Sequence, residues 1–189
     1  MIHRTMRFVL PVLAAGVLLA GCAGQSTGPA PSASASAAGH NQADVTFAQQ
    51  MIPHHQQAVE MAKLVPAGTA NQPIRDLASR IQQAQDPEIA TMTGWLTAWG
   101  APAPMAGMDH GSMAGMMSAT EMADLAKAKG AEFDRRWLTM MTAHHQGAID
   151  MAKAELGQGG SGEAKQLAQQ IIDAQQREIT TMNGLLSAG

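Results

Sequence analysis

The feature that most constrains this chain is an internal repeat at an offset of 90 residues. Residues 51–63 read MIPHHQQAVEMAK, and residues 141–153 read MTAHHQGAIDMAK. The same offset aligns residues 77–96 with residues 167–186 without a gap. Self-similarity at a fixed offset indicates a duplicated structural unit. Each half is therefore predicted to contain a helix, a loop and a second helix.

Capping and terminating residues place two helices in the first half. Asp44 is predicted to cap the first helix, which ends near Val65 and Pro66. Pro73 lies where a second helix begins, because proline is tolerated in the first turn, and this helix runs to about Trp99.

The second half has equivalent signals. Ser118 and Glu121 form a predicted capping box for a third helix. A fourth helix is predicted over residues 162–186. The end of the third helix is marked by three glycines: Gly157, Gly159 and Gly160.

Two prolines fall inside the predicted helices. Pro53 and Pro87 should each kink a helix or mark a late start, because proline removes a backbone donor. The second repeat has Ala143 and Arg177 at these positions, so the architecture does not require either proline. Two hairpins of similar length pack most simply as an antiparallel four-helix bundle, and we expect an all-α fold.

The amino-acid composition agrees with an all-α fold and excludes several functions. Aromatic residues make up 3% of the chain, whereas 15 methionines are present, and straight-chain residues favour helices. The net charge is −3, and the sequence contains no basic cluster of the kind that binds nucleic acid. Cys22 is the only cysteine, so an intrachain disulfide and a thiolate metal site are both excluded.

The N-terminus resembles a bacterial lipoprotein signal peptide over residues 1–21. Arg4 and Arg7 precede an apolar stretch that is too short to span a membrane comfortably, and the segment leads to Leu-Ala-Gly-Cys22. We expect cleavage before Cys22 and lipidation of its thiol, which would anchor the protein to the outer face of the cell membrane. The alternative is an ordinary signal peptide with a cysteine there by chance.

The mature chain divides into a tether and a folded part. Residues 22–43 contain the lipidated cysteine and a segment rich in Ser, Ala, Gly and Pro, which cannot bury a core. The bundle is predicted over residues 44–189. Its parts are a repeat at 44–99, a Met-rich loop at 100–117 and a repeat at 118–189.

On an ideal helix, the paired histidines share one face with methionine and alanine. At 100° per residue, the histidines, methionines and alanines of residues 51–62 fall within an arc of 120°, which is the width of a core-facing stripe. Phe47 and Val65 extend this stripe at its two ends. The first set is Met51, His54, His55, Ala58, Met61 and Ala62, and the second repeat has Met141, His144, His145, Ala148 and Met151.

The second helix of each half has a carboxylate on its apolar face. A buried, unpaired carboxylate is costly, so Glu88 needs a partner, and a histidine of the facing helix would serve. Glu178 and Met182 repeat Glu88 and Met92 in the other half. The first-half stripe is predicted to comprise Leu77, Ile81, Ala84, Glu88, Met92, Trp95 and Trp99.

Taken one at a time, these residues have an ordinary interpretation. Methionine at helical spacing usually fills a core, and one inward histidine is usually a hydrogen-bonded core residue. Four inward histidines in two adjacent pairs are different, because each buried imidazole must be satisfied and leucine would pack at lower cost. We therefore favour a metal site or another polar site.

A Met-rich loop separates the two halves and reads MAGMDHGSMAGMM over residues 105–117. No helical stripe explains its methionines, and MDHGSM is similar to short Met/His motifs of periplasmic copper-resistance proteins. We expect an auxiliary copper-binding loop, and the alternative is a flexible linker. Its candidate ligands are Met105, Met108, His110, Met113, Met116 and Met117.

Copper fits this set of ligands best. Thioethers select Cu(I), and imidazoles accept either oxidation state. Zinc has little use for methionine, and the Glu-x-x-His pattern of di-iron bundles is absent from this sequence, as is HExxH. Glu60 and Asp150 are predicted to face solvent. Because the ligand is neutral imidazole, binding is expected to weaken below about pH 6.5.

These motifs resemble a bacterial family known as domain of unknown function 305. Its pattern M-x-x-H-H-x-x-A-x-x-M-A-K matches both repeats, and its A-Q-x-x-E-I-x-x-M matches residues 84–92 and 174–182. The resemblance covers residues 44–189 and implies a ferritin-like four-helix bundle. Because a periplasmic member of that family binds copper, it also implies copper binding or resistance. By motif, the implied site residues are Met51, His54, His55, Met61, Glu88 and Met92, with Met141, His144, His145, Met151, Glu178 and Met182.

Three functions remain open at this point. The first is an extracytoplasmic copper-binding protein that acts as buffer, chaperone or resistance factor, with copper, the membrane and a copper-handling protein as partners and no enzymatic activity. The second is a redox enzyme with a ferritin-like metal centre. The third is a structural or partner-binding envelope lipoprotein. One shared metal site and two separate sites are equally compatible with the sequence.

Overall fold

A computed structural model describes residues 39–104 and 113–188, and in these ranges the chain forms helices and no strands. The predicted all-α fold class is confirmed. None of the described helices is long and apolar enough to cross a membrane. The predictions for residues 1–21, Cys22 and most of the tether, and for Met105, Met108 and His110, lie outside the described residues. The helices are α1 (Gln42–Gly68), α2 (Gln72–Ala98), α3 (Ala119–Lys127), α4 (Gly130–Gln158) and α5 (Gly162–Ala188).

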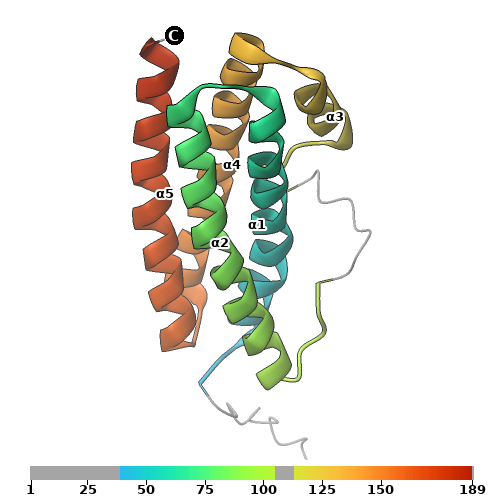
Figure 1. The fold of residues 1–189 in the computed structure, drawn as a ribbon. Helices are drawn as coiled ribbons and strands as arrows, with labels where there is room; N and C mark the ends of the chain where they lie inside the picture. The colour runs from blue at the N-terminus through green and yellow to red at the C-terminus, as the bar shows by residue number, and fades with distance from the viewer. Residues whose placement is uncertain (1–38, 105–112, 189) are drawn as a thin grey trace, which may run out of the picture. The chain divides into compact units, whose positions relative to one another are not determined.

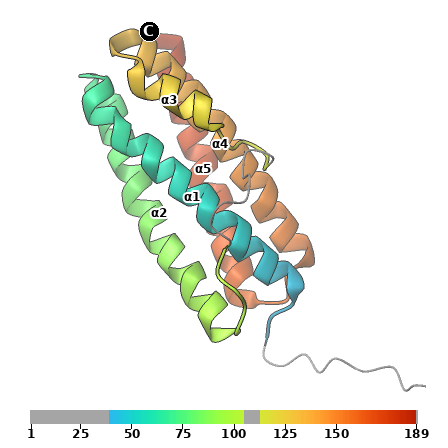
Figure 2. The ribbon, with the colours of Figure 1, turned by 90° about the vertical axis from the view of Figure 1, so that its right-hand side faces the viewer.

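The four long helices form two hairpins that meet through α1 and α4. α1 packs against α2, α4 packs against α5, and α1 also packs against α4. Figures 1 and 2 show that α1 and α5 run in one direction and that α2 and α4 run in the other. The segment between α2 and α4 therefore returns along the length of the helices, and the short α3 lies on its second part.

The start of α1 differs from the prediction. Asn41, not Asp44, is the N-cap residue, and its side chain accepts hydrogen bonds from Ala43 N and Asp44 N. Asp44 completes a capping box by accepting from the Asn41 backbone. The helix continues through Pro53 and Pro66 to Gly68, so Pro53 does not mark a late start. Pro87 likewise lies inside α2.

The predicted third helix is two helices. The capping box of Ser118 and Glu121 is present, but it caps the nine-residue α3. Ala128 and Lys129 are extended, and α4 starts at Gly130, whose φ of 54° is in the left-handed region that glycine favours. The sequence analysis ended the third helix only at Gly157, Gly159 and Gly160, so it did not predict the break at Ala128–Gly130.

The core consists of two apolar clusters that the 90-residue offset relates to each other. Both combine residues from the two hairpins. The first is centred on Met61, Ile81 and Met141, and the second on Met51, Met92 and Ile171. The duplicated sequence thus produces a duplicated core.

A pair of buried acids joins the start of α1 to the turn between α4 and α5. Asp44 accepts hydrogen bonds from Gly160 N and from Ser161 N, the latter at 2.8 Å. Burial raises the pKa of Asp44, but hydrogen bonding to the Glu155 side chain and to the backbone of Asn41, Ser161 and Gly160 outweighs it, so this pKa is lowered. Burial and the neighbouring Asp44 raise the pKa of Glu155 to about 8. A Cβ on Gly159 would collide with the Glu155 carboxyl group, so glycine is needed here for space.

Replacing Glu155 with glutamine should remove a pH-dependent loss of stability. The pKa of Glu155 is higher in the folded chain than the ordinary 4.5, so its contribution is greatest in acid and is lost as pH rises to about 8. We expect the fall in unfolding free energy between pH 5 and pH 9 to be about 4 kcal/mol smaller in E155Q. Urea denaturation at both pH values measures this, with E163Q at an exposed site as control. Equal slopes in E155Q and the parent chain would contradict the assignment.

Candidate metal centre

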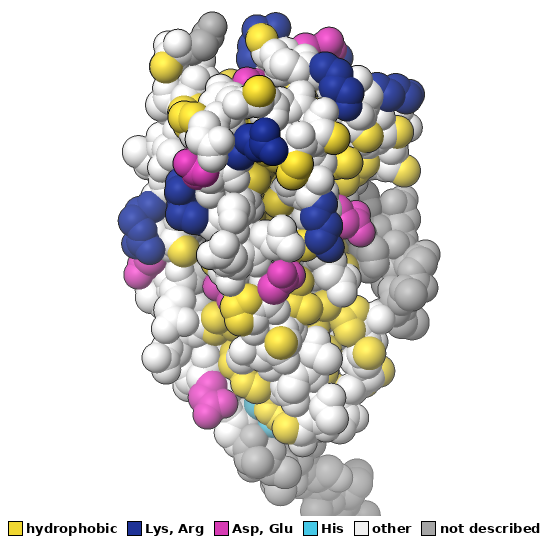
Figure 3. Space-filling view, viewed as in Figure 1, with side chains coloured by type: hydrophobic (Ala, Val, Ile, Leu, Met, Phe, Trp, Pro, Cys, Tyr) yellow, Lys and Arg dark blue, Asp and Glu magenta, His cyan; other side chains and the backbone are white. Residues whose placement is uncertain are grey.

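Four histidines form a polar layer between the two apolar clusters. On α1, His54 and His55 lie between Met51 of the second cluster and Ala58 of the first, and α4 repeats this order in reverse. All four side chains are buried, with 0% exposure for His54, His55, His144 and His145. Figure 3 shows histidine colour only near one end of the face in view, and charges of both signs scattered over that face.

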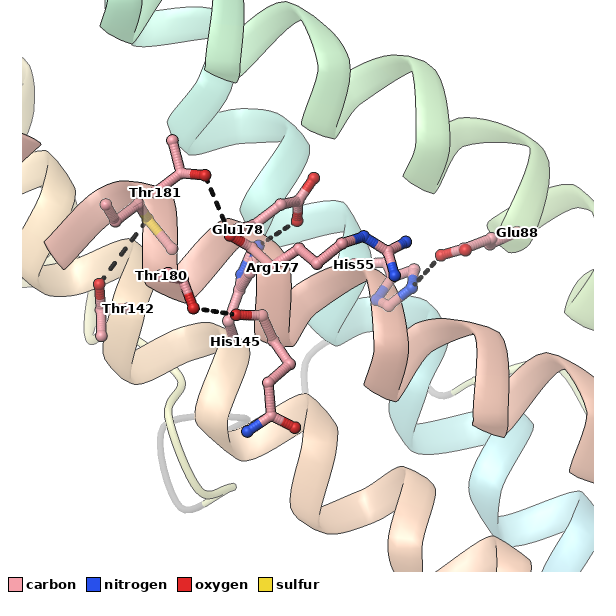
Figure 4. A network of polar contacts seen from close by, with 10 residues as sticks. His55, Glu88, Thr142, His145, Arg177, Glu178, Thr180 and Thr181 are labelled. Atoms are coloured by element: carbon pink, nitrogen blue, oxygen red, sulfur yellow. Dashed lines mark hydrogen bonds and ion pairs between the residues drawn. The ribbon is translucent and has the colours of Figure 1, made fainter. Parts of the chain in front are cut away.

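Two of the histidines are hydrogen-bonded to the carboxylates of the second helices. His55 Nε2 lies 2.7 Å from Glu88 Oε2, and His145 Nε2 lies 2.7 Å from Glu178 Oε2. Each glutamate side chain is 18% exposed. Figure 4 shows that each pair joins the two helices of its own hairpin. The expectation that a histidine of the facing helix partners Glu88 is thus confirmed.

The other two histidines meet between the hairpins. The ring centroids of His54 and His144 are 3.8 Å apart, with the ring planes inclined by 39°. Burial lowers the pKa of His54 to about 3 and lowers the pKa of His144 well below 6.5, and the neighbouring histidines add to both effects. Both rings therefore stay neutral in weak acid, whereas the weakening of binding below about pH 6.5 stays a prediction.

Several ring nitrogens in this layer have no hydrogen-bond partner among the described residues. They are Nδ1 of His54, His55 and His145, and both ring nitrogens of His144. An unpartnered polar atom in a core is costly, and native proteins contain few. Such atoms indicate a group that the described chain does not supply.

The candidate methionines lie on both sides of the histidine layer. Met51 and Met141 each lie one turn before a histidine pair, and both are fully buried. Met182 accepts a hydrogen bond from Thr142 Oγ1 at 3.7 Å. Met151 is the exception, because it is half-buried. The other fully buried candidates are Met61, Met92 and Met182.

The second part of the Met-rich loop, residues 113–117, docks beside the histidines. Gln57 holds it with two hydrogen bonds of 2.7 Å, one to the backbone N–H and one to the carbonyl of Met117. The Ala114 carbonyl lies 3.2 Å from His54 Nε2. Met117 is 9% exposed and packs in the first cluster. It is therefore a core residue, contrary to the prediction that the methionines of this loop have no role in packing. Met113 and Met116 are half-buried.

Comparison with known proteins identifies the family. The family model "Domain of unknown function (DUF305)" matches residues 44–186. The chain belongs to the DUF305 family. Among curated proteins, no sequence matches it significantly.

Solved DUF305 structures have the same fold. A DUF305 protein from Streptomyces coelicolor is 36% identical, with 77% of this chain and 93% of that chain covered and a TM-score of 0.72. A DUF305 fragment from Deinococcus radiodurans is 34% identical, with 79% and 98% covered and a TM-score of 0.73. CopM in its Cu(I)-bound form is 30% identical, with 77% and 96% covered and a TM-score of 0.65.

The DUF305 motif contains a buried glutamine that the helical wheel did not predict. Ala84 was predicted to face the core, but it is exposed, and its neighbour Gln85 is 2% exposed. Gln175, at the equivalent position, is 3% exposed. Neither side-chain amide oxygen has a hydrogen-bond partner among the described residues. The identity of Gln85 and Gln175 across the repeat was the signal that could have revealed them.

The residues of this DUF305 chain fit copper better than a hard cation. Across residues 39–104 and 113–188, no three His, Cys, Asp or Glu side chains are arranged to hold a metal ion. Besides the carboxylates of Glu88 and Glu178, the donors in and beside the layer are imidazoles and thioethers, which suit Cu(I). Glu60 and Asp150 are exposed, as predicted, and lie away from the layer.

Gly147 gives the docked segment room, and Gly147→Ala should release it. A Cβ at this position would collide with the Ala114 carbonyl, whereas one at Gly157 on the same helix would meet nothing within 4 Å. We expect G147A to lose protection of the Met117 amide by about 10-fold or more in hydrogen exchange, because the segment would undock. G157A is the matched control and should be unchanged or up to about 1 kcal/mol more stable. Unchanged Met117 protection in G147A would contradict the docking.

Proposed function

We propose that this protein binds copper outside the cytoplasm, as a buffer, chaperone or resistance factor. The observation that carries the proposal is the buried layer of four histidines, in which five of the eight ring nitrogens lack partners among the described residues. A core selected for stability alone would fill these positions with hydrocarbon. The layer costs folding energy, and binding a metal would recover it.

The comparison with CopM supports copper as the metal. Solved forms of CopM contain Cu(I), Cu(II) or Ag, at 28–30% identity across all its forms. Silver and Cu(I) are both soft cations that accept thioether ligands. In this chain, five of the six methionines assigned to the two repeats are fully buried close to the histidine layer.

The proposal also covers architecture and location. We interpret the four long helices as an antiparallel, ferritin-like four-helix bundle, in which ligands project inward from facing helices. We further propose that lipidated Cys22 anchors the mature protein to the membrane and that the segment between Cys22 and the start of α1, which the sequence predicted as residues 22–43, serves as a tether. Copper would be stored or transferred without chemical conversion of a substrate, so the protein would not be an enzyme.

A competition titration tests this function. Metal-free mature protein is mixed with a coloured Cu(I) chelator under anaerobic conditions, and transfer of Cu(I) is followed by loss of the chelator's absorbance. We expect a dissociation constant well below micromolar. Binding no tighter than micromolar would reject the proposal. Metal analysis of protein purified from its native compartment separates it from the redox alternative, which requires iron or manganese.

A further inference from the structure

The two nitrogens of each buried imidazole have different surroundings. In His55 and His145, Nε2 faces a glutamate oxygen at 2.7 Å, whereas Nδ1 is buried without a partner among the described residues. The offset of 90 relates the two pairs, and their distances and exposures are identical. The same asymmetry therefore arises twice, from two independent pairs of helices.

This asymmetry selects one tautomer. A carboxylate only accepts hydrogen bonds, so the nitrogen facing it must carry the proton. Nδ1 of the neutral ring then keeps its lone pair. A protonated Nδ1 would instead be a buried donor without an acceptor among the described residues, which is the costlier arrangement. The lone pairs of Nδ1 in His55 and His145 are thus available to a ligand.

The same logic extends to His54. Its Nε2 lies 3.2 Å from the Ala114 carbonyl, which is also only an acceptor, and its Nδ1 has no partner among the described residues. Among the described residues, His144 has a hydrogen-bond partner at neither ring nitrogen, so no contact there selects its tautomer. Three of the four imidazoles therefore have the same protonated nitrogen, held by three different acceptors.

We propose that the metal binds Nδ1 of His55 and His145, and that Glu88 and Glu178 are positioning residues rather than ligands. This inference rests on the proposed copper function and changes two of the ligands assigned from the sequence. A carboxylate that accepts the other N–H fixes the orientation of the ring and increases the basicity of the ligating nitrogen. Each glutamate would therefore act on the metal only through its histidine.

The first test needs no metal. In protein labelled with ¹⁵N in histidine, long-range ¹H–¹⁵N correlation spectra distinguish a protonated from an unprotonated ring nitrogen. We expect Nε2 protonated and Nδ1 unprotonated in both His55 and His145. The opposite tautomer in either residue, or a doubly protonated ring at pH 7.5, would overturn the inference.

The second test adds Ag(I), a diamagnetic stand-in for Cu(I), to the same labelled protein. We expect the Nδ1 resonances of His55 and His145 to shift while their Nε2 protons remain. Binding that shifts Nε2 instead, or that leaves both residues unchanged, would overturn the inference and leave the proposed function standing. If no Ag(I) or Cu(I) binds at all, the proposed function itself fails.

Variants then separate a positioning role from a ligand role. E88Q and E178Q each keep an oxygen acceptor but lose the negative charge, and we expect each to weaken Cu(I) binding by about 10–100-fold. The Ag(I)-induced shift at Nδ1 should persist in both variants. E60Q, at an exposed site on α1, is the matched control and should leave the affinity unchanged. Loss of the Nδ1 shift in E88Q with binding retained elsewhere would indicate that Glu88 is itself a ligand.

Discussion

Replacing His54 and His144 together with leucine is expected to weaken Cu(I) binding by more than about 100-fold, beyond the usual effect of changing a positioning residue. The same double variant should be more stable than the parent chain without metal, by about 1–3 kcal/mol at pH 7. The gain is expected because three of the four ring nitrogens in this pair are buried without partners among the described residues, and leucine removes them.

Two measurements on H54L/H144L check whether Cu(I) affinity falls while stability without metal rises. Chelator competition gives the Cu(I) affinity, and urea denaturation of the metal-free protein gives the unfolding free energy. Q56L/Q146L is a matched control, because these glutamines follow the histidine pairs on the same helices and are exposed. A double variant that loses stability along with affinity would show that the histidines are ordinary core residues.

Acid should destabilise the metal-free protein through the same two histidines. Their pKa values in the folded chain are depressed below the ordinary 6.5, to about 3 for His54. As pH falls below 6.5, the unfolded chain takes up protons that the folded chain cannot hold. We expect a loss of about 1.4 kcal/mol for each pH unit and each histidine, continuing toward pH 3 for His54.

The difference between two denaturation series isolates this effect. Unfolding free energies of the parent chain and of H54L/H144L are measured from pH 7 to pH 4, without metal. Glu155 acts in the opposite direction above pH 4.5, but it is present in both chains and cancels in the difference. The stability advantage of the variant should widen steadily as pH falls. A constant difference would mean that the two rings are protonated in the folded protein.

The sequence carried most of the information about the histidine layer. The offset of 90 and the 3.6-residue periodicity were sufficient to place His54, His55, His144 and His145 in the core, because a helix that buries one face must bury every residue on it. The need of Glu88 for a partner followed from the cost of burying a carboxylate. The all-α fold followed from the same periodicity.

What the sequence could not provide depends on contacts between distant segments. The break between α3 and α4 lies at Ala128–Gly130, where two extended residues precede a glycine with a φ of 54°. Ala84 and Gln85 lie about 100° apart on the wheel, at the two edges of the apolar stripe, and a rotation of a few tens of degrees decides which one is buried. The partner of His54 is a backbone carbonyl of Ala114, which no side-chain pattern reveals.

One difference between the two repeats could have indicated where the segment that connects them docks. Gln57 in the first half is replaced by Gly147 in the second, inside an otherwise matching motif. Gln57 holds the docked segment, and Gly147 makes room for it. This one difference between the two copies marks where the connecting segment docks, whereas the shared histidines mark the histidine layer.

The most direct test of this account is a crystal structure of the copper-loaded protein with anomalous scattering measured at the copper edge. We predict an anomalous peak inside the helices at the histidine layer, in contact with Nδ1 of His55 or His145. A fully loaded protein whose anomalous signal lies only in the Met-rich loop or on the surface, with the four imidazoles packed as they are without metal, would contradict it.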